Sequence, residues 1–243
     1  MRFIDWFPYY QDIRQQFGYS TEKDQEAANI LSKMIKKKTI DIKVLQRKIA
    51  RRHVMAIGAG DSLISNIKFI KQNRKFVKIV ADGATQALIE NHITPDIVVT
   101  DLDGDSLSLR KAERAGAIMV VHSHGDNVEE LKKLVPTFRR VIGSTQVMPV
   151  ENVYNFGGFT DGDRCVFLAD EFGAKEIVLV GMEFGDRIGE HSKKMVKNIE
   201  LKKEKMKVGK RLLEILAKRS HSRLFDTSQR PIRGFTSLTI QYD

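Results

Sequence analysis

Residues 95–106 read Pro-Asp-Ile-Val-Val-Thr-Asp-Leu-Asp-Gly-Asp-Ser. The apolar run at 97–99, bounded by a proline and by turn residues, is typical of a buried strand in a parallel sheet. Three carboxylates follow it at every second position: Asp101, Asp103 and Asp105. Alternate residues of an extended chain point the same way, so these groups would repel one another unless a cation lay between them. The stretch therefore indicates a Mg²⁺ site at the end of a strand. The competing interpretation is a solvated turn in which Asp105 or Ser106 caps the next helix.

Two earlier strand-like runs, 53–57 and 76–80, also end in loops of small and polar residues. After the first comes Gly-Ala-Gly-Asp-Ser, followed by an apolar pattern that predicts a helix through residues 63–70. Glycines between a strand and a helix let the backbone approach a phosphate, and the helix N-terminus favours negative charge. After the second comes Ala-Asp-Gly-Ala-Thr, whose acidic residue is suited to bind a ribose, to hold a metal, or to cap the next helix. The candidate ligand-binding residues of these loops are Gly58, Gly60, Asp61, Ser62, Asp82, Gly83 and Thr85.

A predicted strand at 117–121 ends in a dense polar group, His-Ser-His-Gly-Asp-Asn. Zinc binding through the two histidines is conceivable, but no further Cys or His cluster supports it. We favour contacts with phosphate, a base or Mg²⁺-bound water, and we take His122, His124 and Asp126 as candidate general bases. Asp126 or Asn127 is also suited to cap the following helix.

A glycine-rich stretch, Asn-Phe-Gly-Gly-Phe-Thr-Asp-Gly-Asp at 155–163, follows a predicted strand at 139–142. Its flexibility and backbone donors suit it to wrap a ligand. It opens a predicted helix at 164–172, with Thr160 or Asp161 as the cap, and a further strand is predicted at 175–180. The candidate ligand-binding residues here are Gly157, Gly158, Thr160 and Asp161.

Both ends of the chain are predicted to be largely helical. The periodicity of residues 1–50 predicts helices without a catalytic grouping, which we interpret as a subdomain or lid packed on an α/β core. Residues 192–219 predict a long basic amphipathic helix, and Gly209 is a candidate bend in it. The segment 193–223 holds 12 Lys or Arg and 3 Asp or Glu. Such a face attracts nucleic acid or an anionic substrate, although a solvated helix face is the simpler interpretation. The tail is expected to form a short strand or hairpin.

The expected organisation is a helical N-terminal subdomain at 1–50, an α/β nucleotide-binding catalytic core at 51–190, and a C-terminal helix and tail at 191–243. The single Cys165 excludes an internal disulfide. The N-terminus has no signal-peptide pattern, and no apolar run approaches the ~20 residues needed to span a bilayer. We therefore expect a soluble cytoplasmic protein without a membrane partner.

The alternation of strands and helices predicts a doubly wound, mostly parallel, Rossmann-like α/β sheet with an N-terminal helical extension and a long C-terminal basic helix. Nearly every strand ends in a loop of Gly, Asp or His residues, so one ligand site is shared among them. The segment 81–126 holds 8 Asp or Glu and 3 Lys or Arg, which makes this rim acidic. An acidic rim binds polyphosphate poorly unless Mg²⁺ intervenes, so a Mg²⁺-nucleotide is the expected ligand.

Five motifs, in their order along the chain, resemble those of the archaeal 6-hydroxymethyl-7,8-dihydropterin diphosphokinases, the MptE-like family. They lie at residues 58–63, 81–85, 95–104, 122–127 and 157–163. The pattern is more distantly similar to thiamine pyrophosphokinase, in which Asp-Gly-Gly-Ala and Gly-Asp-x-Asp-Ser turns serve nucleotide and Mg²⁺. Here Ala84 replaces the second glycine, and Thr-Asp-Leu-Asp-Gly at 100–104 replaces the second turn, which argues against thiamine as the substrate.

The resemblance implies a Mg²⁺-dependent diphosphotransferase that acts in pterin, methanopterin or folate-type cofactor biosynthesis. It would move diphosphate from ATP to the hydroxymethyl oxygen of a reduced pterin and release AMP. We assign Asp101 and Asp103 to Mg²⁺, with Asp82 or Asp105 as a further ligand. The loops at 58–62 and 122–127, the second of which includes Asn127, would handle phosphates or nucleotide, and the loop at 156–163 would close over the pterin. The catalytic candidates are Asp101, Asp103, His122, His124 and Asp126.

Two other classes remain open at this stage. An S-adenosylmethionine-dependent methyltransferase would use the glycines at 58–60 and Asp82, but it leaves the row of carboxylates at 101–105 unexplained. A non-catalytic nucleic-acid-binding protein would use the basic helix, but it leaves the strand-end loops unexplained. A nucleic-acid partner is therefore disfavoured, and the formation of a homo-oligomer is left open.

Overall fold

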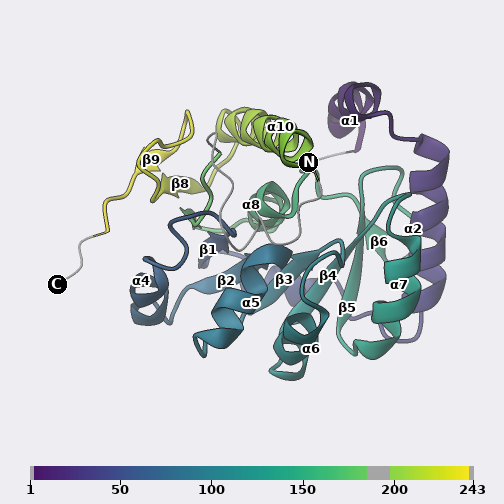
Figure 1. The fold of residues 1–243 in the computed structure, drawn as a ribbon, viewed down its shortest axis with the longest axis horizontal. Helices are drawn as coiled ribbons and strands as arrows, with labels where there is room; N and C mark the ends of the chain where they lie inside the picture. The colour runs from purple at the N-terminus through teal and green to yellow at the C-terminus, as the bar shows by residue number, and fades with distance from the viewer. Residues whose placement is uncertain (1–2, 185–197, 241–243) are drawn as a thin grey trace.

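A nine-stranded, all-parallel sheet forms the centre of the computed structural model, which describes residues 3–184 and 198–240. The strand order is β6-β5-β4-β3-β2-β1-β7-β8-β9 (Figure 1). The strands are β1 (His53–Ile57), β2 (Val77–Ala81), β3 (Ile97–Thr100), β4 (Ile118–Ser123), β5 (Val141–Thr145), β6 (Val153–Tyr154), β7 (Glu176–Val180), β8 (Arg223–Asp226) and β9 (Thr236–Ser237).

Helices cover both faces of this sheet (Figure 1). They are α1 (Phe3–Phe17), α2 (Thr21–Ile35), α3 (Lys43–Ile49), α4 (Ile67–Gln72), α5 (Asp82–Glu90), α6 (Ser106–Arg114), α7 (Val128–Leu134), the short 3₁₀ turn η1 (Val135–Thr137), α8 (Asp161–Glu171) and α10 (Ile199–Ala217). The predicted doubly wound α/β fold is confirmed, and so is a long C-terminal helix.

Alternation along the central strand explains why the sheet has helices on both sides. Met55 and Ile57 of β1 point into a core shared with α4 and α5. Their neighbours Val54 and Ala56 point into the larger core, which α8 and α10 also enter. Since successive side chains of a strand face opposite sides, a run that is apolar at every position requires cover on both faces.

Several predicted boundaries were wrong for identifiable physical reasons. Residues 61–66 form turns instead of the start of a helix, and the Ser62 hydroxyl and amide there both donate to the Glu183 carboxylate. The fifth strand runs to Thr145, beyond the predicted end at 142. Gly143 was interpreted as a turn residue, but it lies within the strand because only glycine fits there against β6: an added Cβ would lie 2.6 Å from Val153 Cγ2.

The C-terminal tail forms the short strands β8 and β9, in agreement with one of the two predicted alternatives. These two strands pair in parallel, so the other alternative, a hairpin, is wrong. Gly209 does not divide α10. It lies where this helix crosses the start of α8, and a Cβ added there would lie 3.1 Å from Asp163 Oδ1, which is a tight contact. The first residues of the predicted basic helix, 192–197, and the proposed boundary at 190–191 lie outside the described residues. In the two described ranges, no helix combines the length and the apolarity that a membrane crossing needs.

The N-terminal helices are tied to the sheet by a buried carboxylate. Asp24 on α2 accepts hydrogen bonds from Tyr10 Oη (2.8 Å), from the Gly125 amide (2.8 Å) and from Gln146 Nε2 (2.7 Å). Trp6 Nε1 donates to the Gln146 carbonyl at 2.8 Å. These contacts join α1 and α2 to the loops that follow β4 and β5, and Trp6 and Tyr10 belong to the main hydrophobic core.

We expect Asp24→Ala to lower the free energy of unfolding by about 3 kcal/mol, since two buried side-chain donors and the half-buried Gly125 amide would lose their acceptor. Urea denaturation followed by circular dichroism measures this quantity. The matched control is Glu26→Ala on the same helix, an exposed position where we expect a change within about 0.5 kcal/mol. Equal stability of the two variants would show that Asp24 does not anchor the N-terminal helices.

Candidate functional site

A cavity of about 700 Å³ lies at the carboxyl ends of the strands. Its walls include the loops after β1, β2, β3, β4 and β7, the start of α8, and residues of α10. The strands run outward from β1 to β6 in one direction, and the chain then returns to place β7 on the other side of β1. Ligands of open α/β sheets bind at such a point of reversal, because the loops there diverge and leave a crevice.

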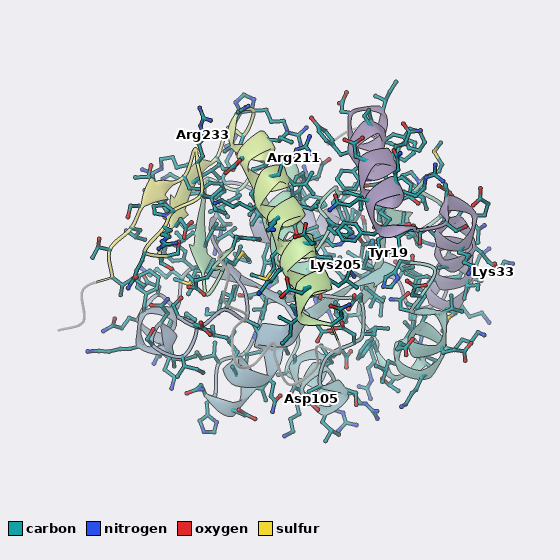
Figure 2. The ribbon with its side chains drawn as sticks, turned by 45° about the horizontal axis from the view of Figure 1, so that its top comes forward. Tyr19, Lys33, Asp105, Lys205, Arg211 and Arg233 are labelled. Carbon is teal, nitrogen blue, oxygen red and sulfur yellow. The ribbon has the colours of Figure 1, made fainter. Side chains whose placement is uncertain are left out.

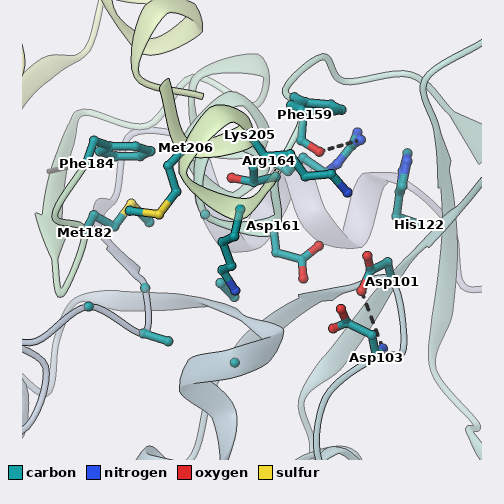
Figure 3. A pocket seen from close by; sticks show the side chains of 18 of the residues that line it. Asp101, Asp103, His122, Phe159, Asp161, Arg164, Met182, Phe184, Lys205 and Met206 are labelled. Carbon is teal, nitrogen blue, oxygen red and sulfur yellow. Dashed lines mark hydrogen bonds between the residues drawn. The ribbon is translucent and has the colours of Figure 1, made fainter. Parts of the chain in front are cut away.

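Four carboxylates meet on one side of the cavity. Asp82, Asp101, Asp103 and Asp161 each offer an oxygen, and these atoms all lie within 4.8 Å of one another. Figure 3 shows three of them, Asp101, Asp103 and Asp161, facing the same space. They come from the ends of β2 and β3 and from the first turn of α8.

The backbone of the Asp-rich stretch is not extended as the spacing suggested. Leu102 has a φ of 73°, so the chain turns between Asp101 and Asp103, and the Asp103 amide donates to Asp101 Oδ1 at 3.4 Å. The turn is held by the Leu102 amide, which donates to Thr100 Oγ1 at 2.8 Å, while that hydroxyl donates to Asp82 Oδ2. The expected proximity of the first two carboxylates is therefore present, but a turn produces it.

The cluster holds protons that isolated carboxyls would lose. Burial, together with the nearby charge of Asp101, raises the pKa of Asp82 to about 7. Desolvation in the cavity and the charges of Asp101 and Asp82 raise the pKa of Asp103 to about 8. Burial and the charges of the other three carboxylates, Asp101, Asp82 and Asp103, raise the pKa of Asp161 well above its usual range. A bound cation would reverse these shifts, because it favours the ionised carboxylates.

Asp101 is the ionised member of the cluster. Burial alone would raise its pKa, but the hydrogen bond and charge of His124 and the hydrogen bonds from Asp103 outweigh burial and lower the pKa to about 2. His124 Nε2 lies 3.6 Å from Asp101 Oδ2, and His124 Nδ1 accepts from the Asp126 amide at 3.2 Å. Because Nδ1 accepts the amide proton, Nε2 is the nitrogen whose proton faces Asp101, and His124 acts as a donor in this arrangement.

A second polar group lies near this cluster, around Arg164 on α8. The side chain is buried, and its Nη2 donates to the Phe159 carbonyl (3.0 Å) and to Gln146 Oε1 (3.3 Å). His122 at the end of β4 is also buried, with Nδ1 3.2 Å from Ser144 Oγ. Burial, followed by the charges of Arg164 and His124, lowers the pKa of His122 well below 6.5, so its imidazole is neutral.

Helix α10 forms part of the cavity wall. Lys205 Nζ lies 5.7 Å from the centre of the Tyr19 ring and 6.0 Å from that of Phe159. Figure 2 labels Lys205 on α10 and, close to it, Tyr19. Lys202 contributes positive charge that favours ionised Asp103. Met206, together with Met182 and Phe184, gives the opposite end an apolar lining (Figure 3). The described part of the basic helix therefore places lysines at the cavity as well as in solvent.

The glycine loop after β1 packs against the loop after β7. A Cβ on Gly58 would lie 2.7 Å from the Gly181 carbonyl, and one on Gly60 would lie 1.8 Å from Glu183 Oε2. Both glycines line the cavity, so close approach of backbone is the reason for their residue type.

Not every predicted residue reaches the cavity. Asp105 caps α6 by accepting from the Ser108 amide at 2.8 Å, as the competing interpretation of the turn predicted. Of the two alternatives for a further ligand, Asp82 lies in the four-carboxylate cluster and Asp105 does not. The Thr85 hydroxyl on α5 donates to the carbonyl of Ala81, the residue that precedes this helix. The cavity wall also omits Asp61, Ser62, Asp126, Asn127, Gly157 and Gly158.

Some of these residues do not line the cavity but hold its wall residues in place. Asn127 Nδ2 donates to the Asp101 carbonyl (2.7 Å) and to the His122 carbonyl (2.8 Å), which joins the ends of β3 and β4. Gly158 has a φ of 83°, and a Cβ there would lie 2.9 Å from Arg164 Cα, so this glycine lets the loop pack on α8. Thr160 is the N-cap of α8, as one of the two predicted alternatives had it.

The remaining predicted residues line the cavity. Gly83, His122, His124, Thr160 and Asp161 do so, and Asp82 is buried within the carboxylate cluster. Sequence reasoning missed Gln146, Arg164, Glu183 and the α10 lysines as wall residues. An arginine three positions after Asp161 was a usable signal, because residues three apart share one side of a helix.

Comparison with known proteins identifies the family. The family model described as 6-hydroxymethylpterin diphosphokinase MptE-like matches residues 26–189. The chain belongs to the MptE-like family. This match confirms the resemblance drawn from the five motifs, and the curated relatives, which are named as diphosphotransferases, confirm the predicted enzyme class.

Three curated relatives carry the name 6-hydroxymethyl-7,8-dihydropterin pyrophosphokinase. The Methanocaldococcus jannaschii protein is 42% identical over 227 residues, which cover 87% of this chain and 94% of the relative. The Pyrococcus furiosus protein is 44% identical over 234 residues, which cover 94% of this chain and 100% of the relative. The Methanothermobacter thermautotrophicus protein is 41% identical over 189 residues, which cover 77% of this chain and 81% of the relative.

A solved structure supports the fold alone. The MAf glycosyltransferase from Magnetospirillum magneticum AMB-1 matches with a TM-score of 0.51 at 17% sequence identity. The match covers 88% of this chain and 38% of the glycosyltransferase chain.

The raised pKa values of the cluster predict how metal-free protein responds to pH. A folded state that retains protons loses stability as pH rises from the unfolded carboxyl pKa, near 4, to the folded values of about 7 and 8. Asp103→Asn removes one titrating charge, so we expect its melting temperature in EDTA to fall less between pH 5 and pH 8 than that of the wild type, by about 2–4 °C.

Differential scanning fluorimetry at both pH values measures this difference. The control is Asp126→Asn, an exposed residue of the neighbouring loop, which should follow the wild type. Mg²⁺ added at pH 8 should raise the melting temperature of the wild type much more than that of Asp103→Asn. The assignment of raised pKa values fails if Asp103→Asn and the wild type lose stability equally.

Proposed function

We propose that this protein transfers diphosphate from ATP to 6-hydroxymethyl-7,8-dihydropterin with the help of Mg²⁺, within a pterin-based cofactor pathway of the methanopterin or folate type. The single observation that carries the proposal is the four-carboxylate cluster at the carboxyl ends of the strands of a doubly wound parallel sheet, an architecture that often binds nucleotides. Family membership and the printed names of three relatives support the acceptor.

The residues present fit a hard divalent cation. Carboxylate oxygens are the protein ligands that Mg²⁺ prefers, and four converge here. Asp82 Oδ1 is buried and has no hydrogen-bond partner among the described residues, which is costly unless another group occupies the space beside it. We assign Asp82, Asp101, Asp103 and Asp161 as the metal-holding residues. When bound, Mg²⁺ supplies neutralisation of the phosphate charge.

The reaction needs little covalent help from the protein. The pterin hydroxymethyl oxygen attacks the β-phosphorus of ATP, and the bond from that phosphorus to the α–β bridging oxygen breaks. The bridging oxygen leaves with AMP, the product carries the diphosphate, and the hydroxyl proton is released. Catalysis of such a step consists mainly of positioning and of charge stabilisation.

The cavity offers different surroundings to the two substrates. The lysines of α10 and the carboxylate cluster suit the triphosphate end of Mg²⁺-ATP. The flat pterin suits the aromatic and apolar walls, which include Tyr19, Phe159 and Met206. His124 donates toward Asp101, and Asp126 does not reach the cavity, so neither fills the role of general base in this arrangement.

The first experiment is AMP release from ATP and Mg²⁺, run in parallel with the reduced pterin, with thiamine and with no acceptor. We expect AMP and pterin diphosphate, identified by mass spectrometry, only with the pterin. AMP with thiamine alone would keep the reaction and replace the acceptor. Folded protein that forms AMP with neither acceptor would refute the proposed activity, and binding of S-adenosylmethionine without Mg²⁺ would then favour a methyltransferase.

The metal assignment has its own prediction. Asp101→Asn and Asp161→Asn should each lower kcat/KM by about 100-fold and raise the Mg²⁺ concentration needed for half-maximal rate, since each removes a charged ligand. The matched control is Asp105→Asn, which keeps a capping side chain at the start of α6 and lies outside the cluster. Full Mg²⁺-dependent turnover by Asp101→Asn would contradict the assignment.

A further inference from the structure

Arg164 is a buried cation without a counter-charge in contact. The side chain is 4% exposed, and in the ranges 3–184 and 198–240 no carboxylate oxygen lies within ion-pair distance of its guanidinium. Its Nη1 is buried and has no hydrogen-bond partner. Burying a guanidinium is expensive unless anions or acceptors compensate it. The charges of Asp163 and Asp161 offset part of this cost from a distance, but Nη1 still lacks an acceptor among the described protein atoms.

His122 presents a second buried group without a partner. Its Nε2 has no hydrogen-bond partner, while Nδ1 faces Ser144 Oγ. When Nδ1 accepts the Ser144 hydroxyl proton, Nε2 carries the imidazole proton and becomes a donor. Figure 3 shows the Arg164 guanidinium between Phe159 and His122 at the cavity wall. Two unused nitrogens, one cationic and one neutral, therefore adjoin the same space.

The guanidinium also lies next to the carboxylate cluster. Asp161 and Arg164 are three residues apart at the start of α8, so their Cβ atoms are about 5–6 Å apart on one side of the helix. If a cation at Asp161 held one phosphate of a polyphosphate chain, the oxygens of the neighbouring phosphate would reach Arg164. Arginine suits this task because its planar donors match phosphate oxygens.

We propose that Arg164 and His122 form an anion site, called here the Arg164 site, that donates hydrogen bonds to the oxygens of the transferred diphosphate. The proposal rests on the function proposed above and makes Arg164 a catalytic residue of that reaction. As the bond to AMP breaks and the bond to the pterin oxygen forms, both phosphates of the moving group stay in contact with these donors. The charge that develops on them is stabilised in a site with little water.

Gln146 holds the guanidinium in place. Its Oε1 accepts from Arg164, its Nε2 donates to Asp24 on α2, and its carbonyl accepts from Trp6 on α1. The Phe159 carbonyl holds the other side of Nη2. With Nη2 fixed by two acceptors, Nη1 is the nitrogen left to bind a ligand, and Gln146 is a positioning residue.

Inorganic pyrophosphate is the direct probe, because it resembles the transferred group and needs no turnover. Calorimetric titration in the presence of Mg²⁺ should give a dissociation constant that weakens about 10- to 100-fold in Arg164→Met. His122→Leu should weaken it by a smaller factor, since that change removes a neutral donor. The matched control is Arg223→Met, an exposed arginine that pairs with Glu176 near the starts of β7 and β8, the end of the sheet away from the cavity.

Arg164→Lys guards against a folding defect in Arg164→Met, since it keeps the positive charge and loses the planar pair of donors. Thermal unfolding first establishes which variants are folded. With the pterin assay, folded Arg164→Lys should show kcat lowered about 100-fold with little change in the KM for the pterin. Folded Arg164 variants that bind pyrophosphate as tightly as the wild type and keep its kcat would overturn the Arg164 site.

The two proposals fail separately. Wild-type protein that binds pyrophosphate through Arg164 but forms no AMP with the pterin would retain the anion site and refute the proposed reaction. Wild-type protein that forms pterin diphosphate with Arg164 variants of unchanged activity would retain the reaction and refute the Arg164 site.

Discussion

Electrostatic repulsion among four carboxylates is the constraint around which the loops of this protein are built. Asp82, Asp101, Asp103 and Asp161 each place a carboxylate oxygen within 4.8 Å of the others, so their negative charges repel one another. The chain tolerates them through a hydroxyl from Thr100, an imidazole N–H from His124, and retained protons. Each of these interactions favours one protonation state of one carboxyl group. Binding of a cation would therefore release the retained protons from the cluster.

The same constraint explains the residue types around the cluster. Gly104 has to lack a side chain, because a Cβ there would lie 1.7 Å from Asp82 Oδ1. Leu102 adopts a left-handed conformation that a leucine rarely takes, and the Thr100 hydroxyl holds it there. Backbone strain of this kind persists where the surrounding structure determines it, which is common at functional sites.

Positive charge is arranged in two layers around the cavity. Lys202 and Lys205 come from a solvent-facing helix and can follow a ligand as it enters. Arg164 is fixed inside by Gln146, which in turn is fixed by Asp24 and Trp6 from the first two helices. The N-terminal helices therefore support Gln146, which follows them by more than a hundred positions in the chain and holds Arg164 in place. They are hydrogen-bonded to the loops after β4 and β5, which fits a fixed support better than a lid.

The sequence was informative where chemistry follows the ends of strands, since parallel strands bring those ends together. This rule located Asp82, Asp101, Asp103, His122 and His124 beside one cavity before the fold was known. It failed for Asp105, whose spacing matched the cluster but whose position favours a helix cap. Arg164 was missed although its spacing from Asp161 was a usable signal, whereas Gln146 could not be assigned, because its role arises from a contact with Asp24, which is distant in the chain. Pairing at β6 and β9 was missed for the same reason, since two-residue strands carry no periodicity.

The central position of β1 affects the chain while it is being synthesised. β1 pairs with β2 on one edge soon after both emerge, but its other edge pairs with β7, which is made only after β6 and α8. Until β7 is made, that edge of β1 has polar backbone amides and carbonyls without their partner strand, and such an edge is a template for another nascent chain. The order of the strands along the chain therefore determines how long this edge of an apolar strand waits for its partner during synthesis.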